Sequence, residues 1–227
     1  MKFELYQIIS IAAVISCFIP ILIVALKRLW QDTFFLLFST YWLLGGLANL
    51  LDFIPGLSKE ARETIGVIYN LIDLPFLLFI LRYTTSSDMV KRYVTFSLAL
   101  FLGFEILNLI IYGFRYDALK YTLGSGIALV LIVLIWEIIL YLQLIEQSNR
   151  QTAKIFIYAA LLFEYGTFIV IYIFDYFLPN ANSRDTYLIY YISTLVALFI
   201  ASCGYMAVRM NKTRKADLYA SASNMEW

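Results

Sequence analysis

The feature that most constrains this chain is a series of seven long apolar runs. Each run has about 20 residues, the length that an α-helix needs to cross the hydrocarbon core of a bilayer. A segment inside lipid must satisfy its own backbone polar groups, so runs of this length predict helices rather than open sheets. The runs cover residues 6–26, 34–54, 63–82, 93–113, 120–142, 155–177 and 187–208.

The connections between these runs are short and contain turn residues such as Pro55, Gly56 and Pro179. We therefore predict an all-α membrane protein with a seven-transmembrane-helix bundle over residues 1–211 and a short basic and polar tail over residues 212–227. The composition agrees, because 62% of the residues are apolar and 15% are charged, against about 25% charged residues in soluble domains. A net charge of +1 indicates no nucleic-acid partner.

Lysine and arginine are distributed unevenly between the two sides of the predicted bundle. One side holds 11 of the 17 basic residues and the other side holds six. Basic residues are in excess on the cytoplasmic side of membrane proteins. This predicts a multi-pass protein of the cell membrane (plasma or inner) with its N-terminus outside and its C-terminus cytoplasmic. The richer side contains Lys27, Arg28, Arg82, Lys91, Arg92, Arg150, Lys154, Arg209, Lys212, Arg214 and Lys215.

Six acidic residues lie within the apolar runs or near their ends. A charge at the centre of a bilayer costs about 2.5–3.5 kcal/mol on insertion scales. No lysine or arginine lies at the depth of the deepest acids. We therefore expect these acids to face the interior of the bundle and to be protonated or hydrated. The six are Asp52, Asp73, Glu105, Glu137, Glu164 and Asp175.

Two consecutive runs contain the same pattern, G-x-x-x-N-L-[L/I]-D. Residues four and three apart share one helix face, so each pattern forms a small and polar stripe. Because consecutive helices are antiparallel, each aspartate is expected to lie level with the partner's glycine, where two backbones can approach closely. The two asparagines are expected at similar depth. The residues are Gly45, Asn49 and Asp52 in the first run, and Gly66, Asn70 and Asp73 in the second.

The fourth run adds Glu105 and Asn108, again an acid and an amide on one helix face. Asp73 and Glu105 are both expected about 12–14 Å below the outer ends of their helices. Pro75 predicts a kink beside Asp73, because it frees the carbonyl of Leu71. We predict an outward-facing binding pocket for a ligand or ion. Its candidate residues are Asn49, Asp52, Asn70, Asp73, Glu105 and Asn108. The alternative is that they only hold helices together, as buried amides commonly do.

Three further acids complete a series by depth: Asp175 lies near the outer end of its helix, like Asp52, and Glu164 and then Glu137 lie nearer the predicted cytoplasmic side. Ordered by depth, Asp175, Glu164 and Glu137 are candidates for a proton relay, which membrane proteins build from such intramembrane acids. The relay requires that these side chains face one another. Glu137 has an alternative, because it lies near the cytoplasmic end of its helix and can extend toward Arg150 or Lys154.

Several kinds of chemistry lack the residues that they need. The chain has no histidine, which removes histidine-ligated zinc or haem and histidine-activated nucleophiles. The last run contains no lysine for a retinal Schiff base, and the sequence has no P-loop. Cys17 and Cys203 lie in apolar runs, so neither a disulfide nor a cysteine metal site is expected. We expect no catalytic residue, no cofactor and no metal.

The sequence favours two function classes over a third. The favoured class is a non-enzymatic sensor, receptor-like protein or accessory subunit, which signals through a protein partner or self-association at its cytoplasmic face. The alternative is a proton- or cation-coupled transporter of small solutes that uses the intramembrane carboxylates. An enzyme with paired carboxylates is the weaker third class. A transporter predicts a midplane site between helices from two halves of the chain, whereas a sensor predicts a pocket open only outward.

The predicted orientation can be tested with epitope tags. We expect a tag at the N-terminus, and another within residues 179–184, to bind antibody on intact cells, because these segments lie on the side that is poorer in basic residues. A tag at the C-terminus should bind antibody only after the cells are permeabilised. A C-terminal tag that is labelled equally in intact cells would overturn this orientation.

Overall fold

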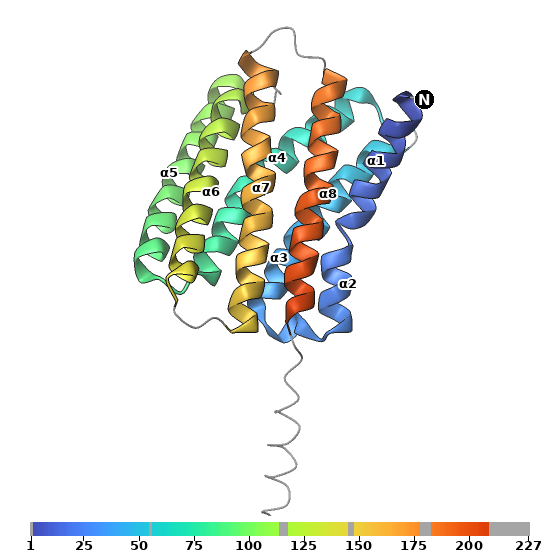
Figure 1. Cartoon of the computed structure of the whole chain (residues 1–227). Helices are drawn as coiled ribbons and strands as arrows, with labels where there is room; N and C mark the ends of the chain where they lie inside the picture. The colour runs from blue at the N-terminus through green and yellow to red at the C-terminus, as the bar shows by residue number, and fades with distance from the viewer. Residues whose placement is uncertain (1, 55, 114–117, 145–147, 178–182, 209–227) are drawn as a thin grey trace, which may run out of the picture.

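The computed structural model of the chain describes residues 2–54, 56–113, 118–144, 148–177 and 183–208, and over these ranges it is helical without a strand (Figure 1). Seven helical segments in this part are long and apolar enough to cross a membrane, which confirms the number predicted. The predicted boundary between bundle and tail, at residues 211 and 212, lies outside the described residues. The segments are Leu5–Leu26, Thr33–Leu50, Glu60–Thr84, Asp88–Tyr112, Leu119–Leu142, Asn149–Phe177 and Tyr187–Ala207.

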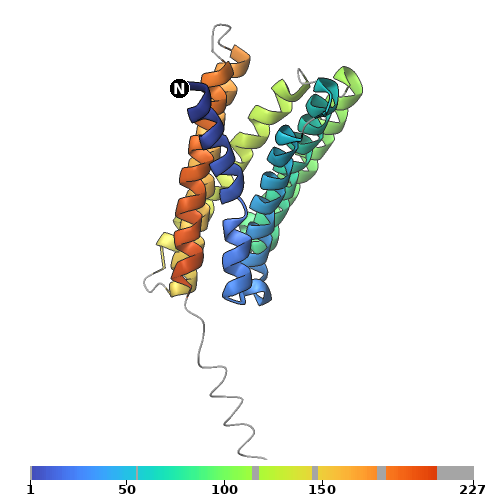
Figure 2. The same cartoon turned by 90° about the vertical axis from the view of Figure 1, so that its right-hand side faces the viewer.

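The first of these segments is built from two helices, α1 (Lys2–Ser16) and α2 (Ile19–Leu26). Pro20 lies in the first turn of α2, where its missing N–H leaves no hydrogen bond unmade. The axis therefore changes direction between the two helices, as Figure 2 shows. The other helices are α3 (Thr33–Leu50), α4 (Lys59–Thr84), α5 (Asp88–Tyr112), α6 (Leu119–Leu142), α7 (Asn149–Phe177) and α8 (Ser183–Ala207), with short 3-10 turns η1 (Leu29–Gln31) and η2 (Leu51–Phe53).

Several helices begin at a polar N-cap residue, before the start of the predicted apolar run. Asp32 accepts a hydrogen bond from the backbone N–H of Phe34 at the start of α3 (3.1 Å). Ser58 caps α4 and Ser87 caps α5 in the same way. Such caps satisfy backbone donors that the first helical turn leaves without partners. As a result, α4 and α5 begin before residues 63 and 93, where the apolar runs themselves begin.

Consecutive long helices run in opposite directions and give the bundle two distinct ends (Figure 1). At one end, here called the N-terminal end, α1, α4, α6 and α8 begin; at the other, the C-terminal end, α3, α5 and α7 begin. The contact between α7 and α8 is the most extensive. Further contacts join α8 to α1 and α2, α2 to α3, α3 to α4, α4 to α6 and α6 to α7, which closes a ring. Helix α5 packs on α4 and α6.

The C-terminal half of the ring is filled by buried aromatic and aliphatic side chains. The Tyr158 ring of α7 meets the rings of Phe34 and Phe38 of α3 nearly edge-on, with centroids 5.5 and 5.7 Å apart. Phe35 and Tyr205 are also fully buried and in contact. Aromatic pairs in this geometry are worth about 0.5–1.5 kcal/mol beyond the area that they bury. This half is therefore a packed core.

Small residues allow α7 and α8 to approach each other. A Cβ atom placed on Gly204 of α8 would lie 2.8 Å from Cβ of Phe156 and 2.9 Å from the backbone oxygen of Ala153, both on α7. Ala201 and Ala197, on the same helix as Gly204, are fully buried. Close approach of helix backbones over small residues is the usual way in which helices associate in lipid.

We expect Gly204→Ala to lower the stability of the protein by about 1–3 kcal/mol, because the added methyl group must push a backbone apart. Gly103→Ala in α5 is the matched control, since a Cβ at Gly103 meets nothing within 4 Å. Thermal unfolding in detergent would measure both variants. If Gly204→Ala melts like the parent, or if Gly103→Ala loses as much stability as Gly204→Ala, the described contact between α7 and α8 is wrong.

Candidate ligand pocket

A pocket of about 380 Å³ lies between α3, α4, α6, α7 and α8. Leu51, Arg62 and Tyr187 line it near the N-terminal end of the bundle, at what we call its mouth. Asp73 and Glu164 line its deepest part, which we call its floor, together with Cys17, Tyr41, Trp42 and Thr194. Pockets of this size are common sites for small molecules. We therefore take this pocket as the candidate functional site.

Two tyrosines donate hydrogen bonds to the carboxylate of Asp73, and a third tyrosine is hydrogen-bonded to one of them. The Tyr165 hydroxyl donates to Oδ2 of Asp73 at 2.8 Å, and the Tyr69 hydroxyl donates to Oδ1 at 3.1 Å. The hydroxyls of Tyr41 and Tyr165 are 2.6 Å apart. Because Tyr165 has one proton and donates it to Asp73, the hydroxyl of Tyr41 is the donor in this pair. The result is a chain of hydrogen bonds from α3 through α7 to α4.

Two different donors hold Glu164, which is 5% exposed. The indole N–H of Trp42 donates to Oε2 at 3.2 Å, and the Thr194 hydroxyl donates to Oε1 at 3.3 Å. Asp73 and Glu164 lie close enough to interact electrostatically. All of the donors named for the two carboxylates are neutral side chains, so none of them supplies a compensating charge.

The hydrogen bonds of the two acids involve two pairs of adjacent residues, one pair on α3 and one on α7. Tyr41 and Trp42 are neighbours on α3, and Glu164 and Tyr165 are neighbours on α7. Neighbouring side chains on a helix point about 100° apart. Consequently Trp42 bonds to Glu164, whereas the neighbouring residue on each helix takes part in a different set of bonds. Tyr41 bonds to Tyr165, and Tyr165 donates to Asp73 on α4. The same two pairs thus connect α3 and α7 with both acids.

Both acids lie deep in the bundle. Asp73 lies about 21 Å along α4 from the first residue of that helix, Lys59, at 1.5 Å per residue. Glu164 lies about 20 Å from Phe177, where α7 ends at the same end of the bundle. The hydrocarbon core of a bilayer is about 30 Å thick. In helices that span a bilayer, a carboxylate at this position would lie far from both membrane surfaces.

The described lining of the pocket contains one basic residue, Arg62, which lies at the mouth. One of its terminal guanidinium nitrogens donates to the backbone oxygen of Ile54 at 3.0 Å. Among the described residues at the floor there is neither lysine nor arginine. The described residues also contain no group of three or more acidic, cysteine or histidine side chains that could hold a metal ion.

The structure places most of the sequence-predicted residues of the second and third spans in this pocket. Asn49 and Asn70 line it, as do Asp73, Glu164 and Asp175. Asn49 donates to the Tyr190 hydroxyl at 3.2 Å and to the Gly45 oxygen at 2.9 Å, whereas Asn70 donates to the oxygen of Gly66 at 2.8 Å. The side chain of Asp52 lies outside the described residues.

The glycine stripes do not form the close helix contact that we expected. A Cβ on Gly66 would meet nothing within 4 Å, and a Cβ on Gly45 would lie 3.1 Å from the hydroxyl of Tyr69. Both glycines line the pocket instead. The physical reason is that the Tyr69 side chain occupies the space beside Gly45, where the aspartate of the same helix was expected. The two stripes therefore form walls of a cavity.

Glu105 and Asn108 are buried but do not line the pocket. Asn108 donates to the backbone oxygen of Ala118 at 2.5 Å, which ties α5 to the start of α6. The expected sharing of one pocket by Asp73 and Glu105 is not found, because α5 packs outside the ring that surrounds the pocket. The two acids also differ in depth, because Asp73 lies about 21 Å from the start of α4 and Glu105 lies about 10 Å from the end of α5, at 1.5 Å per residue.

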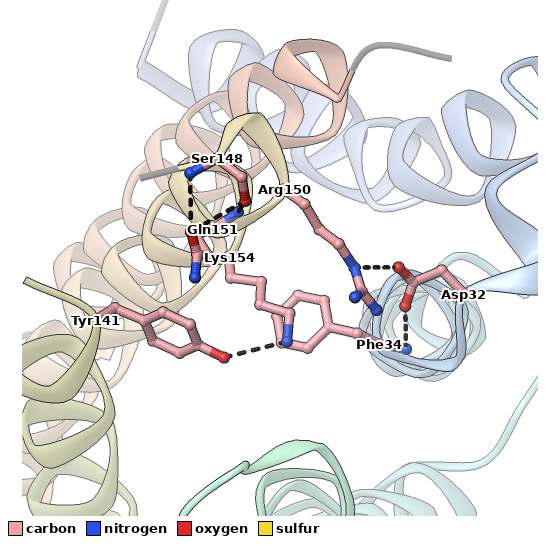
Figure 3. Close-up of polar contacts among 7 residues, drawn as sticks. All are labelled: Asp32, Phe34, Tyr141, Ser148, Arg150, Gln151 and Lys154. Atoms are coloured by element: carbon pink, nitrogen blue, oxygen red, sulfur yellow. Dashed lines mark hydrogen bonds and ion pairs between the residues drawn. The ribbon is translucent and has the colours of Figure 1, made fainter. Parts of the chain in front are cut away.

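Glu137 lies in a separate polar cluster toward the C-terminal end, where it accepts a hydrogen bond from Thr85. Arg150 pairs with Asp32 at 2.6 Å rather than with Glu137 (Figure 3). Lys154 donates to the Tyr141 hydroxyl at 3.1 Å (Figure 3). On α4, the fully buried residues Leu77, Leu78 and Leu81 lie between Asp73 and Thr85. The predicted relay residues are thus divided between two places.

The aromatic residues that line the pocket were not predicted from the sequence as site residues. Trp42 and Tyr190 had a simpler explanation, since aromatic residues favour the ends of membrane helices. A signal was nevertheless present, because Tyr41 and Trp42 lie in the interior of an apolar run and Tyr165 directly follows a deep acid. Aromatic residues with hydroxyl or N–H groups beside a buried acid are the donors that such an acid needs.

Comparison with protein-family models, with curated proteins and with solved structures found no match for this chain.

Cysteine labelling would test whether water reaches the pocket. In a chain that carries Cys17→Ala and Cys203→Ser, we expect Asn70→Cys to react with a water-soluble methanethiosulfonate at least about tenfold faster than Val130→Cys, because Val130 is fully buried. Mass spectrometry of the purified protein in detergent gives both rates. Equal and slow reaction at the two positions would show that the pocket is closed.

Proposed function

We propose that this chain is a seven-helix membrane protein that binds a small ligand in its pocket and acts as a sensor, a receptor-like protein or an accessory subunit, without catalysing a reaction. The observation that carries this proposal is a pocket whose described lining extends from the N-terminal end of the bundle to two deep carboxylates and no further. Concave sites with apolar walls and a few convergent polar groups are the usual form of small-molecule sites.

The direction of ligand entry follows from the distribution of charge. The C-terminal end of the bundle belongs to the side with 11 of the 17 basic residues, which favours the cytoplasm. The mouth of the pocket would then face outward, in a cell membrane. Beyond the floor, the buried side chains of Phe38, Tyr158 and Leu77 favour a closed C-terminal half.

A sensor without a catalytic site must transmit its state by contact. The C-terminal end carries exposed polar and basic groups such as Arg150, which is paired with Asp32. We propose that a protein partner or a second copy of the chain binds at this cytoplasmic end. Binding at the floor would be communicated there through α3 and α7, because both helices contribute to the floor and to the aromatic core.

A transporter is the second candidate, and one observation favours it. The pocket lies between α3 and α4 on one side and α6, α7 and α8 on the other, with its acids near the middle of the helices. Carriers place their sites near the midplane between two groups of helices. A proton- or cation-coupled carrier would have to open the C-terminal half, which includes Glu137 and its hydrogen bond to Thr85.

Labelling from each side of the membrane distinguishes the two candidates. We expect Asn70→Cys, in the chain without its own cysteines, to react with a membrane-impermeant methanethiosulfonate in intact cells and to react at least about tenfold more slowly in inside-out vesicles. This outcome is expected for a pocket open only outward.

Comparable labelling from both sides would favour the carrier and contradict the sensor. Labelling from neither side would contradict both candidates. Val130→Cys is the matched control in each preparation, since it is buried below the floor.

A further inference from the structure

The floor of the pocket holds two buried carboxyl groups, and none of the described side chains that line the floor is basic. Asp73 and Glu164 each accept two hydrogen bonds from neutral donors. An ionised carboxylate has about four acceptor positions, so each has capacity left for a ligand. Buried charges are normally paired, because the cost of removing them from water is high. A positive charge placed between the two carboxylates would meet this need.

Several aromatic residues line the same pocket as these carboxylates. The rings of Phe168 and Tyr190 are stacked, with centroids 5.2 Å apart and planes 19° apart, and both line the pocket. Trp42 and Tyr41 line it on the opposite helix, α3. The face of an aromatic ring attracts a cation, and the attraction reaches about 2 kcal/mol when the cation is desolvated. Sites that recognise quaternary ammonium ligands are commonly lined by aromatic residues.

The same lining disfavours a bare metal ion. Hard cations such as Ca²⁺ require six to eight oxygen ligands at short distance. Here the two acids supply four oxygens, each of which already accepts one hydrogen bond, and the remaining described lining near the floor is mainly aromatic or apolar and adds few oxygen ligands. A volume of about 380 Å³ also provides room for a body larger than one ion.

We propose that the pocket binds a small organic cation, an amine or a quaternary ammonium compound, with its charged nitrogen between Asp73 and Glu164 and its apolar part against the aromatic walls. This inference rests on the proposed function, because it names the chemical class of the ligand for the same pocket. It also explains why two acids, rather than amides, are present at the floor.

Two thiol reagents of similar size and opposite charge provide the test. In the chain with Cys17→Ala, Cys203→Ser and Asn70→Cys, the rate of labelling is measured for 2-(trimethylammonium)ethyl and for 2-sulfonatoethyl methanethiosulfonate. The ratio of the two rates is normalised to the ratio for 2-mercaptoethanol in solution. We expect a normalised ratio of about ten or more in favour of the cationic reagent, because two carboxylates attract it.

Isosteric variants then assign the preference to the floor. Asp73→Asn and Glu164→Gln should each lower the normalised ratio by about threefold or more. Glu105→Gln is the matched control: Glu105 is also a buried acid of a membrane span, but it does not line the pocket, so the ratio should not change. If the floor variants do not fold, the ratio measured in the unmodified floor still decides the question.

A ligand-sized probe gives a second measurement on the unaltered chain. We expect 2-phenylethylammonium at millimolar concentration to raise the melting temperature in detergent, because a ligand that binds only the folded state stabilises it. Neutral 2-phenylethanol and anionic phenylacetate should raise it less.

The outcomes separate this inference from the proposed function. Equal normalised rates for the two reagents, or an equal effect of Glu105→Gln, would overturn the organic cation while leaving an accessible pocket. No reaction with either reagent would overturn the accessible pocket itself, and the organic cation with it.

Discussion

The hydrogen bonds that two deep carboxylates receive from α3, α4, α7 and α8 organise the whole N-terminal half of this bundle. Tyr165 connects Asp73 to Tyr41, and Trp42 connects α3 to Glu164. A carboxylate in an apolar environment must find such donors or lose several kcal/mol. Because large aromatic side chains supply them, the helices that carry these side chains are held apart around a cavity instead of being packed through their glycines.

This arrangement divides the bundle into two halves with different physical properties. Toward the N-terminal end, tyrosine hydroxyls, asparagines and acids line a space of about 380 Å³. Toward the C-terminal end, the same helices α3 and α7 present Phe34, Phe38 and Tyr158, whose rings pack against each other. A change at the floor would therefore act on rigid neighbours, since close-packed cores transmit displacements rather than absorb them.

The buried acids illustrate how environment separates residues of one chemical type. Asp73 and Glu164 share one pocket, Glu105 is buried on α5 outside that pocket, and Glu137 bonds to Thr85 in the C-terminal half. Asp73 and Glu105 do not share a pocket, because depth along the helix is one coordinate and the direction of the side chain around its helix is another, and the two acids differ in both. Pairs of acids acquire a shared role only when both coordinates agree.

The sequence by itself determined the seven apolar spans, their alternating directions and the presence of acids far from any basic residue, because the thickness of a bilayer and the cost of a buried charge act on local composition. It also identified polar stripes on two helices, with Asn49 on one and with Asn70 and Asp73 on the other, because helical periodicity is a local property. Only the tertiary structure decided that these stripes line a cavity, that Glu164 joins Asp73, and that α5 with Glu105 packs outside the ring. Those outcomes depend on how each helix is rotated about its axis, and that rotation is set by side-chain packing between residues more than one hundred positions apart, such as Tyr41 and Tyr165.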